Sequence, residues 1–354
     1  AMGSYAATVL GLAPPSAFEA ALREAFAAAD GAVKRAFGEE AWALPFGSIV
    51  QGAHLDGSDL DLCFDVPDEE NSAVQVNGKW DNSKQVAALK KLLSALKGQF
   101  RVVETRFWKH MRVPIVILGF RDRASGLEVE TDFSVGTVYE DVQKGLTDRV
   151  IRRLLAQCPK ALHMARLVKL WSKVEKLHKA YDGYLNSLGW TLLVLYHCME
   201  KLLICNSLIY EEEPNELGED GSGKVLPPPL HADEGAGDPP EEDLPTCDEL
   251  ADFFEWVAAW EEWWPSEPPP SDGAGSQVWA ISLVDRALIA APPPAKVFPD
   301  SSPFFIEDPG VRMSKDSTEN VARSLKKATW RTTGERCAAA ASTLRRAAQS
   351  DRGA

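Results

Sequence analysis

The fold of this 354-residue chain is decided by FGSIVQG at residues 46–52 and DGSDLDLCF at residues 56–64. The apolar residues before the Gly-Ser pair predict a strand that ends in a turn, and the second stretch predicts another strand. Successive strand side chains point to opposite faces, so Asp59 and Asp61 project from one face while the leucines beside them enter the core.

This constellation indicates half of a phosphoryl-transfer site. Two carboxylates held on one strand face suit Mg²⁺, which takes its remaining ligands from water and substrate phosphate. Gly47 allows close approach of the backbone, and the Ser48 hydroxyl with nearby N–H groups can hold a terminal phosphate. The alternative is a solvated turn. A calcium loop starting at Asp56 is excluded, because its sixth position is not Gly and its twelfth is Pro67.

Length and composition bound the class of protein. A chain of this length predicts two domains, and 45% apolar with 25% charged residues is ordinary for a globular protein. The net charge of −14 argues against a broad basic nucleic-acid surface. The six cysteines show no zinc spacing and predict reduced thiols. The first four residues, AMGS, resemble a remnant of tag cleavage, which leaves the native N-terminus and any targeting peptide open.

Periodicity predicts the elements around this stretch. Residues 16–37 predict an amphipathic packing helix with Ser16 as its N-cap, and residues 83–97 predict a second helix. Residues 127–134 alternate, with Glu128, Glu130 and Asp132 on one strand face. Three like charges on one face predict either a wet surface or a cation site, and two-ion phosphoryl transfer needs a third carboxylate.

The second half of the chain reads as helical. Residues 162–179 predict a helix with a basic stripe, which is either solvated or placed to neutralise phosphates: Arg166, Lys169, Lys173 and Lys176. Residues 188–205 contain His197, Glu200 and Lys201, so they predict a buried helix rather than a membrane span.

Two further segments complete this half. Residues 211–247, rich in acidic residues and Pro, predict a mobile insertion. Residues 248–264 predict an aromatic-rich helix for which core packing is favoured over base stacking.

In this order, the pieces resemble the template-independent RNA nucleotidyltransferases, namely the terminal uridylyltransferase and poly(U)/poly(A) polymerase branch of the polymerase-β-like superfamily. The Gly-Ser and Asp-x-Asp residues are shared across the superfamily, whereas residues 306–309 (IEDP) followed by 320–323 (NVAR) select this branch. The other matching stretches are TDFS at 131–134, LVKLWSK at 167–173, LNSLGWTL at 185–192 and FFEW at 253–256.

The resemblance implies an α+β fold of two lobes with the active site in the cleft between them. It implies a catalytic domain with a mixed sheet at residues 38–140 and a helical central domain at residues 141–350 that carries the insertion 211–247. Residues 5–37 are expected as an N-terminal helix on the helical lobe, after the tag remnant 1–4.

The resemblance also implies roles for individual residues. Asp59 and Asp61 would hold two Mg²⁺ ions (Mn²⁺ as a substitute), and Asp132 would hold the ion that activates the RNA 3′-hydroxyl. The triphosphate would lie on the turn and on polar side chains of the helical domain: Gly47, Ser48, Lys169, Lys173 and Ser187. Asp308 and Asn320 would lie near the base-recognition loop.

The chain departs from the family at the base. Leu188 stands where an aromatic residue usually stacks on the nucleobase, and Glu319 stands where many uridylyltransferases carry His. Glu319 can accept from the N3–H of uracil or from the adenine amino group. UTP is preferred because this architecture without a separate RNA-binding domain resembles the uridylyltransferases, and ATP is the alternative.

The expected partner is the 3′ end of single-stranded RNA, with no membrane. The expected state is a cytoplasmic monomer, with a nuclear or organellar location left open. The competing hypotheses are a transferase acting on a non-RNA acceptor and a non-catalytic descendant.

Overall fold

The computed structural model describes residues 8–65, 75–76, 79–80, 82–107, 113–136, 138–139, 142–201, 203–204, 226–230, 241–260, 279–290, 305–314 and 319–352. The chain divides into two compact units. The sheet unit comprises residues 13–149 and 212–232. The helical unit comprises residues 1–12, 150–211 and 233–354.

The sheet unit is built on a five-stranded mixed sheet with the order β1-β2-β7-β6-β5. The β2 and β7 strands are parallel, and every other neighbouring pair is antiparallel. Its strands are β1 (Trp42–Phe46), β2 (Leu60–Asp65), β5 (Phe100–Arg106), β6 (Ile115–Arg121) and β7 (Glu128–Val135). Two short two-stranded ladders accompany it: β3 (Gln75–Val76) with β4 (Lys79–Trp80), and β8 (Val138–Tyr139) with β9 (Val142–Gln143).

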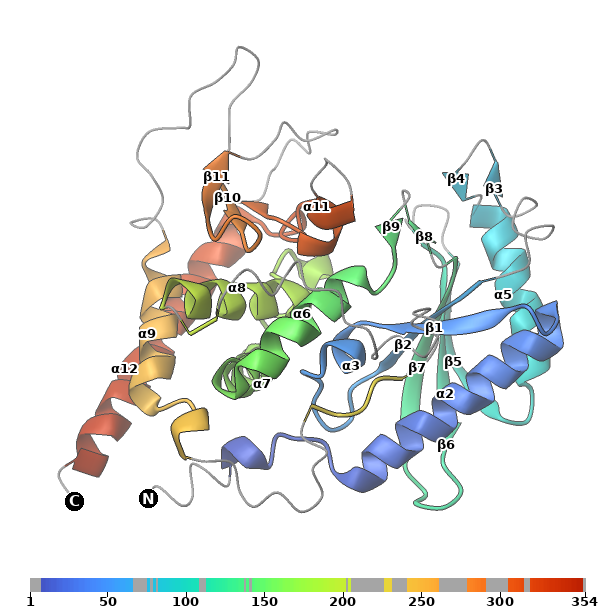
Figure 1. Ribbon diagram of the computed structural model, residues 1–354, viewed down its shortest axis with the longest axis horizontal. Helices are drawn as coiled ribbons and strands as arrows, with labels where there is room; N and C mark the ends of the chain where they lie inside the picture. The colour runs from blue at the N-terminus through green and yellow to red at the C-terminus, as the bar shows by residue number, and fades with distance from the viewer. Residues whose placement is uncertain are drawn as a thin grey trace, which may run out of the picture. The chain divides into compact units, whose positions relative to one another are not determined.

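Two amphipathic helices cover one face of this sheet, α2 (Ser16–Phe37) and α5 (Asn82–Leu96) (Figure 1). Their apolar sides and the inward side chains of the strands form one continuous core, which includes Leu22, Leu89 and Phe133. Because helices occupy one face, the side chains of the opposite face are left for polar residues. The carboxylates of β2 and β7 lie on that opposite face.

The expectation that residues 5–37 pack on the helical domain is wrong for α2. Phe18, Leu22 and Val33 are buried in the same core as the strands, because the apolar side of α2 matches the apolar face of the sheet. The N-cap is Pro15, and no side chain caps the first turn. Ser16 is therefore the first helical residue rather than the predicted N-cap.

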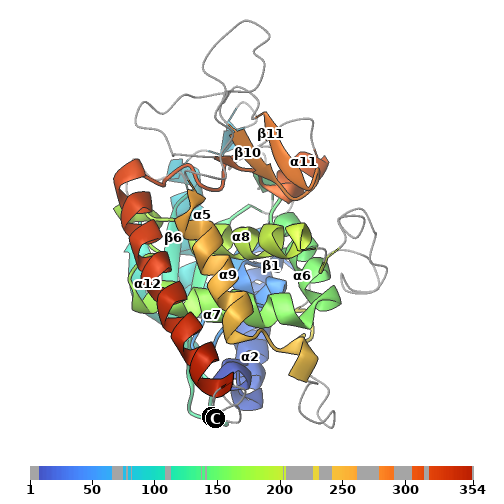
Figure 2. The same cartoon turned by 90° about the vertical axis from the view of Figure 1, so that its left-hand side faces the viewer.

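The helical unit is formed mainly by four long helices that pack in pairs, α7 (Pro159–Val174) with α8 (Ser187–Glu200) and α9 (Cys247–Ala258) with α12 (Lys327–Arg352). The α9 and α12 helices lie side by side along their length (Figure 2). The smaller parts of the unit are η1 (Ala180–Asp182), η3 (Glu241–Asp243), α11 (Pro309–Ser314) and a three-stranded sheet of β11 (Ala287–Ala290), β10 (Trp279–Ser282) and β12 (Phe305–Ile306). The α6 helix (Leu146–Gln157) begins in the sheet unit and ends in the helical unit.

Aromatic residues form much of the core of the helical unit, as predicted for residues 248–264, of which 261–264 lie outside the described residues. Phe253 is fully buried, and Trp190 lies between Trp171 and Trp330, with ring centroids 5.6 and 6.1 Å away. A capping box fixes the start of α9: Thr246 accepts from the Glu249 amide, and the Glu249 carboxylate accepts from the Thr246 amide. This pairing satisfies two of the free N–H groups at the helix end.

One predicted helix boundary needs correction in the helical unit. The helix predicted over residues 162–179 ends at Val174, and the chain then turns through Lys176, whose φ is 61°. Residues 320–323 form a bridge and a turn, and the last helix begins at Lys327. The segment after Asp308 begins as the short helix α11.

The predicted insertion 211–247 falls mostly outside the described residues. Within it, residues 226–230 belong to the sheet unit, where Leu226 is 8% exposed in the core and its carbonyl accepts a hydrogen bond from Arg23. The insertion therefore contributes at least one packed segment to the sheet unit.

The thiol prediction is confirmed for five of the six cysteines: Cys63, Cys158, Cys198, Cys247 and Cys337 are free. Cys205 lies outside the described residues. Among the described helices, none has the length and apolarity that crossing a membrane requires.

Candidate active site

The register of β2 and β7 brings two of the predicted carboxylates together. Asp61 is the direct partner of Asp132 on the neighbouring parallel strand, so both side chains leave the sheet on the same side. The residues beside them confirm the alternation, because Leu60, Leu62 and Thr131 are buried. Adjacent strands lie about 4.8 Å apart, which places the two carboxylates on neighbouring positions of one face.

Asp59 lies just before β2, and its charge acts on Asp132. Burial, followed by the charges of Asp59 and Glu130, raises the pKa of Asp132 from 3.8 to about 7, while Arg106 opposes the rise. The pKa of Glu130 is also raised, first by burial and then by Asp59. The face therefore concentrates negative charge around Asp132.

Asp132 also offers a carboxylate oxygen for metal coordination. Its Oδ1 is buried and makes no hydrogen bond. Among the described residues, no three His, Cys, Asp or Glu side chains are already gathered closely enough to hold a metal ion. Mutual repulsion of carboxylates favours such an open arrangement, and a divalent cation would offset it. The donor set, all carboxylate oxygen, fits Mg²⁺.

The Gly-Ser turn packs directly against this face. Gly47 has a φ of 76° and precedes the one-turn helix α3 (Ser48–Gln51). A side chain cannot be accommodated at Gly47, because a Cβ there would lie 2.2 Å from Asp61 Oδ2. The turn therefore lies against a predicted metal ligand, and Ser48, half-buried, follows it at the start of α3.

Sequence reasoning missed the residues that hold this turn. The Asp148 carboxylate accepts hydrogen bonds from the Gly47 amide at 2.8 Å and from Gln51 Nε2 at 2.6 Å. Lys144 Nζ donates to Ser134 Oγ at 3.0 Å. Asp148 lies about a hundred positions from its partners in the chain, so no local pattern could reveal it.

A cavity of about 240 Å³ opens beside Asp59 within the sheet unit. Its acidic wall includes Glu128, which pairs with Arg101, and Glu130. Its other lining residues come from α2, the loop before β2 and the middle of β6: Phe18, Gly57, Ser58 and Gly119.

The predicted basic stripe is oriented differently from the expectation. Lys169 and Arg166 are 3% and 1% exposed, whereas Leu170 and Val174, expected in the core, are 36% and 69% exposed. Lys173 is exposed, and Lys176 lies beyond the helix end. The side of α7 that carries Arg166 and Lys169 is part of its packing surface, so it is not a solvated stripe.

Ser187 and Leu188 open α8 and are both half-buried. The Asn186 side chain caps this helix by accepting from the Gly189 amide at 2.8 Å. The cap places Ser187 at the first helical position.

The residues predicted near the base make hydrogen bonds and an ion pair within their own segment, residues 306–323. Asn320 Oδ1 accepts from the amides of Ile306 and Ala322, at 3.0 and 2.8 Å. Asp308 Oδ1 accepts from two amides of α11, at 3.0 and 3.1 Å. Glu319 pairs with Arg323. The Asn320 side-chain oxygen therefore has a structural role that the family resemblance did not imply.

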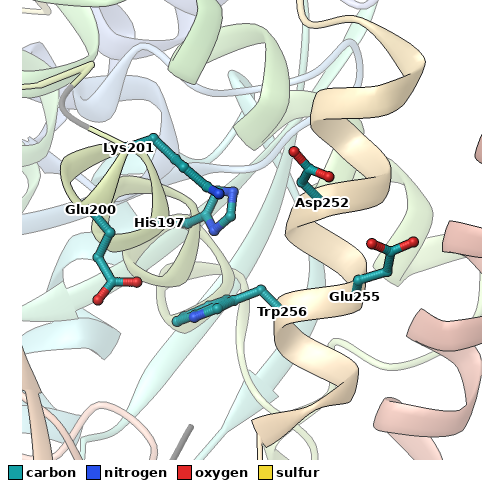
Figure 3. Close-up of a pocket in the computed structure, with 6 residues that line it drawn as sticks. All are labelled: His197, Glu200, Lys201, Asp252, Glu255 and Trp256. Carbon is teal, nitrogen blue, oxygen red and sulfur yellow. The ribbon is translucent and has the colours of Figure 1, made fainter.

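A larger cavity, of about 520 Å³, lies in the helical unit and contains none of the predicted site residues. Figure 3 shows its lining, which comes from the end of α8 and from α9: His197, Glu200, Lys201, Asp252, Glu255 and Trp256. Arg345 pairs with two of its carboxylates, and burial lowers the pKa of His197 to about 4. Because two of its carboxylates already pair with Arg345, the cavity is not part of the predicted nucleotide site.

Part of the chain matches a known protein family. Residues 20–138, which include the turn and all three aspartates, match the family described as the central palm domain of mitochondrial-like poly(A) RNA polymerases. This match covers about a third of the chain, and it shows what residues 20–138 are similar to. The matched region begins within α2 and contains most of this helix, which agrees with the packing of α2 on the sheet.

Solved structures extend the similarity of fold beyond the palm domain. Terminal uridylyl transferase 4 from Trypanosoma brucei with bound dUTP is 20% identical, with a TM-score of 0.60 over 91% of this chain and 93% of that one. The Cid1 poly(U) polymerase with bound MgGTP is 19% identical, with a TM-score of 0.60 over 94% and 91%.

The structure of mtPAP in complex with UTP is 14% identical, with a TM-score of 0.60 over 92% of this chain and 64% of that one. No curated protein sequence matches the chain. At these identities the structures show a shared α+β fold.

Proposed function

We propose that this chain is a template-independent RNA nucleotidyltransferase that adds UMP from UTP to the 3′ end of single-stranded RNA and releases pyrophosphate. The observation that carries the proposal is the register of β2 and β7, which sets Asp61 beside Asp132 next to the Gly47 turn. The palm-domain family and the uridylyltransferase fold support it.

In this proposal, Asp59, Asp61 and Asp132 hold two Mg²⁺ ions, with Mn²⁺ as a substitute. When bound, such ions activate the attacking hydroxyl and stabilise charge on the entering and leaving oxygens. Asp132 contributes the unpaired Oδ1, and a bound cation would favour its ionised form by compensating the neighbouring carboxylates. The Gly47 turn presents the Ser48 hydroxyl and backbone N–H groups to the triphosphate.

The helical unit supplies the rest of the proposed nucleotide site. Lys169, Lys173 and Ser187 are assigned to the triphosphate, and Leu188 packs on the base through apolar contact alone, because it lacks an aromatic face. Asp308, Glu319 and Asn320 belong to the segment assigned to base recognition.

ATP is the second candidate nucleotide, and one observation favours it. The matching palm family is described as that of poly(A) RNA polymerases. Glu319 can accept a hydrogen bond from either base, so its identity does not separate them.

The deciding experiment is a competition among the four ribonucleoside triphosphates on one single-stranded RNA primer with Mg²⁺. We expect UMP to be the main nucleotide added. Predominant addition of AMP would identify ATP as the substrate. Incorporation that does not require RNA would show that the acceptor is not RNA. No incorporation of any nucleotide would refute the proposal.

Aspartate variants connect this activity to the site. We expect Asp59→Ala and Asp61→Ala each to lower the rate by at least ~10³-fold, because removing an ion ligand costs about 4 kcal/mol of transition-state stabilisation. Asp56→Ala is the matched control: this aspartate is exposed in the same loop and has no assigned role. Equal loss in all three variants would show that the loop, rather than the ion ligands, matters.

We further propose that the protein works as a monomer in the cytoplasm. Its net charge of −14 supports solubility and argues against extended non-specific binding to nucleic acid. Light scattering of the purified protein and localisation of the tagged full-length protein test these two points.

A further inference from the structure

Asp148 is placed to control the shape of the phosphate-binding turn. Its Oδ2 accepts from the Gly47 amide at 2.8 Å, and its Oδ1 accepts from Gln51 Nε2 at 2.6 Å. Gly47 precedes α3 and Gln51 ends it, so one carboxylate holds both ends of this single helical turn. Hydrogen bonds to an ionised acceptor are about twice as strong as neutral ones.

The surroundings make this carboxylate a rigid anchor. Asp148 is 7% exposed and lies in the first turn of α6, where the helix dipole stabilises a negative charge. Just before it, Gly145 has a φ of 81°, a left-handed conformation that favours glycine. Lys144 ties the same segment to Ser134 on β7. The segment 144–149 therefore connects the turn to the strand that carries Asp132.

Without the Asp148 carboxylate, the turn loses its two fixed points. The Gly47 amide would be left without its acceptor, and a buried unpaired N–H is unfavourable. Gly47 could then shift relative to Asp61, against which it packs.

We infer that Asp148 is a positioning residue, which holds the Gly47-Ser48 turn in the geometry that binds the nucleotide triphosphate. The inference rests on the proposed function of the turn. Asp148 itself touches neither nucleotide nor metal and acts through the Gly47 amide and Gln51.

Asp148→Ala and Asp148→Asn test this role. Asp148→Ala raises the dissociation constant and the KM of MgUTP by ~10-fold or more, with a smaller effect on kcat, since the turn binds rather than reacts. Asp148→Asn restores most of the affinity: the remaining side-chain oxygen can accept from the Gly47 amide, and the Gln51 amide can turn over to accept from the new NH₂ group.

Asp122→Ala is the matched control for lost stability. Asp122 is also 7% exposed in the sheet unit, and its carboxylate accepts backbone hydrogen bonds from Ala124 and Ser125 in the turn before β7. We expect it to lower the melting temperature while leaving the affinity for MgUTP within twofold of the wild type. Equal affinity of Asp148→Ala and Asp122→Ala would overturn the inference.

Hydrogen exchange separates this inference from the proposed function. In Asp148→Ala, but not in Asp122→Ala, the Gly47 amide should exchange ~10-fold faster or more, because its acceptor is gone. A wild type that neither binds MgUTP nor extends RNA would refute the proposed function, and exchange at residues 47–51 would still decide the Asp148 anchor. Unchanged exchange in Asp148→Ala would overturn it.

Discussion

Replacing Asp132 by Asn should make the metal-free protein more stable at pH 8 while abolishing nucleotide transfer. The folded state raises the pKa of Asp132 from 3.8 to about 7, a shift of about 3 units. At 1.36 kcal/mol per unit, ionisation of Asp132 destabilises the fold by up to about 4 kcal/mol above both pKa values. Water at the half-buried carboxylate screens part of this, so we expect a gain of about 2 kcal/mol.

The sign of the pH dependence follows from the direction of the shift. Because the folded pKa lies above the unfolded one, the wild type loses stability as the pH rises from about 4 to about 7, whereas Asp132→Asn lacks this term. The contribution of position 132 to the free energy of unfolding should therefore be about equal in the two proteins near pH 4 and differ most at pH 8. Urea denaturation at a series of pH values, with EDTA present, measures the difference.

Asp122→Asn provides a control of opposite sign. Hydrogen bonds from the Ser125 hydroxyl and amide lower the pKa of Asp122, so its ionised form stabilises the fold. Asp122→Asn should destabilise the protein at pH 8, and the effect should fade in acid. Adding Mg²⁺ at pH 8 should stabilise the wild type more than Asp132→Asn. Equal or lower stability of Asp132→Asn at pH 8 without metal would refute the reasoning about this charged face.

Three other substitutions test separate parts of the fold and the site. Gly47→Ala should lower the rate of nucleotide transfer by at least ~100-fold, because the added Cβ would lie 2.2 Å from Asp61 Oδ2. Gly57 has a similar φ of 68° with open space around it, so Gly57→Ala should lower stability alone. Asn320→Ala should lower the free energy of unfolding by about 1–3 kcal/mol in urea titration, since it leaves two backbone amides without their acceptor, and an unchanged stability would contradict this structural role. Thr246→Ala should cost about 1 kcal/mol of stability through loss of the capping box, with the rate of transfer unchanged in the primer assay.

Much of the sheet unit follows from local patterns in the sequence. Strand alternation placed Asp61 and Asp132 on a polar face, and the structure agrees because period-two alternation needs only neighbouring residues. The helical period predicted α2 within the observed bounds. The unit on which α2 packs was predicted incorrectly, since an apolar helix face does not specify its partner.

The sequence by itself determined the carboxylate face and the glycine turn, because strand alternation and the constraint at Gly47 are properties of short segments. Only the tertiary structure decided that Lys169 is buried, that Asn320 binds backbone and that Asp148 holds the turn. Each of these depends on a partner brought close by folding, and the free energy of packing, rather than local periodicity, selects that partner.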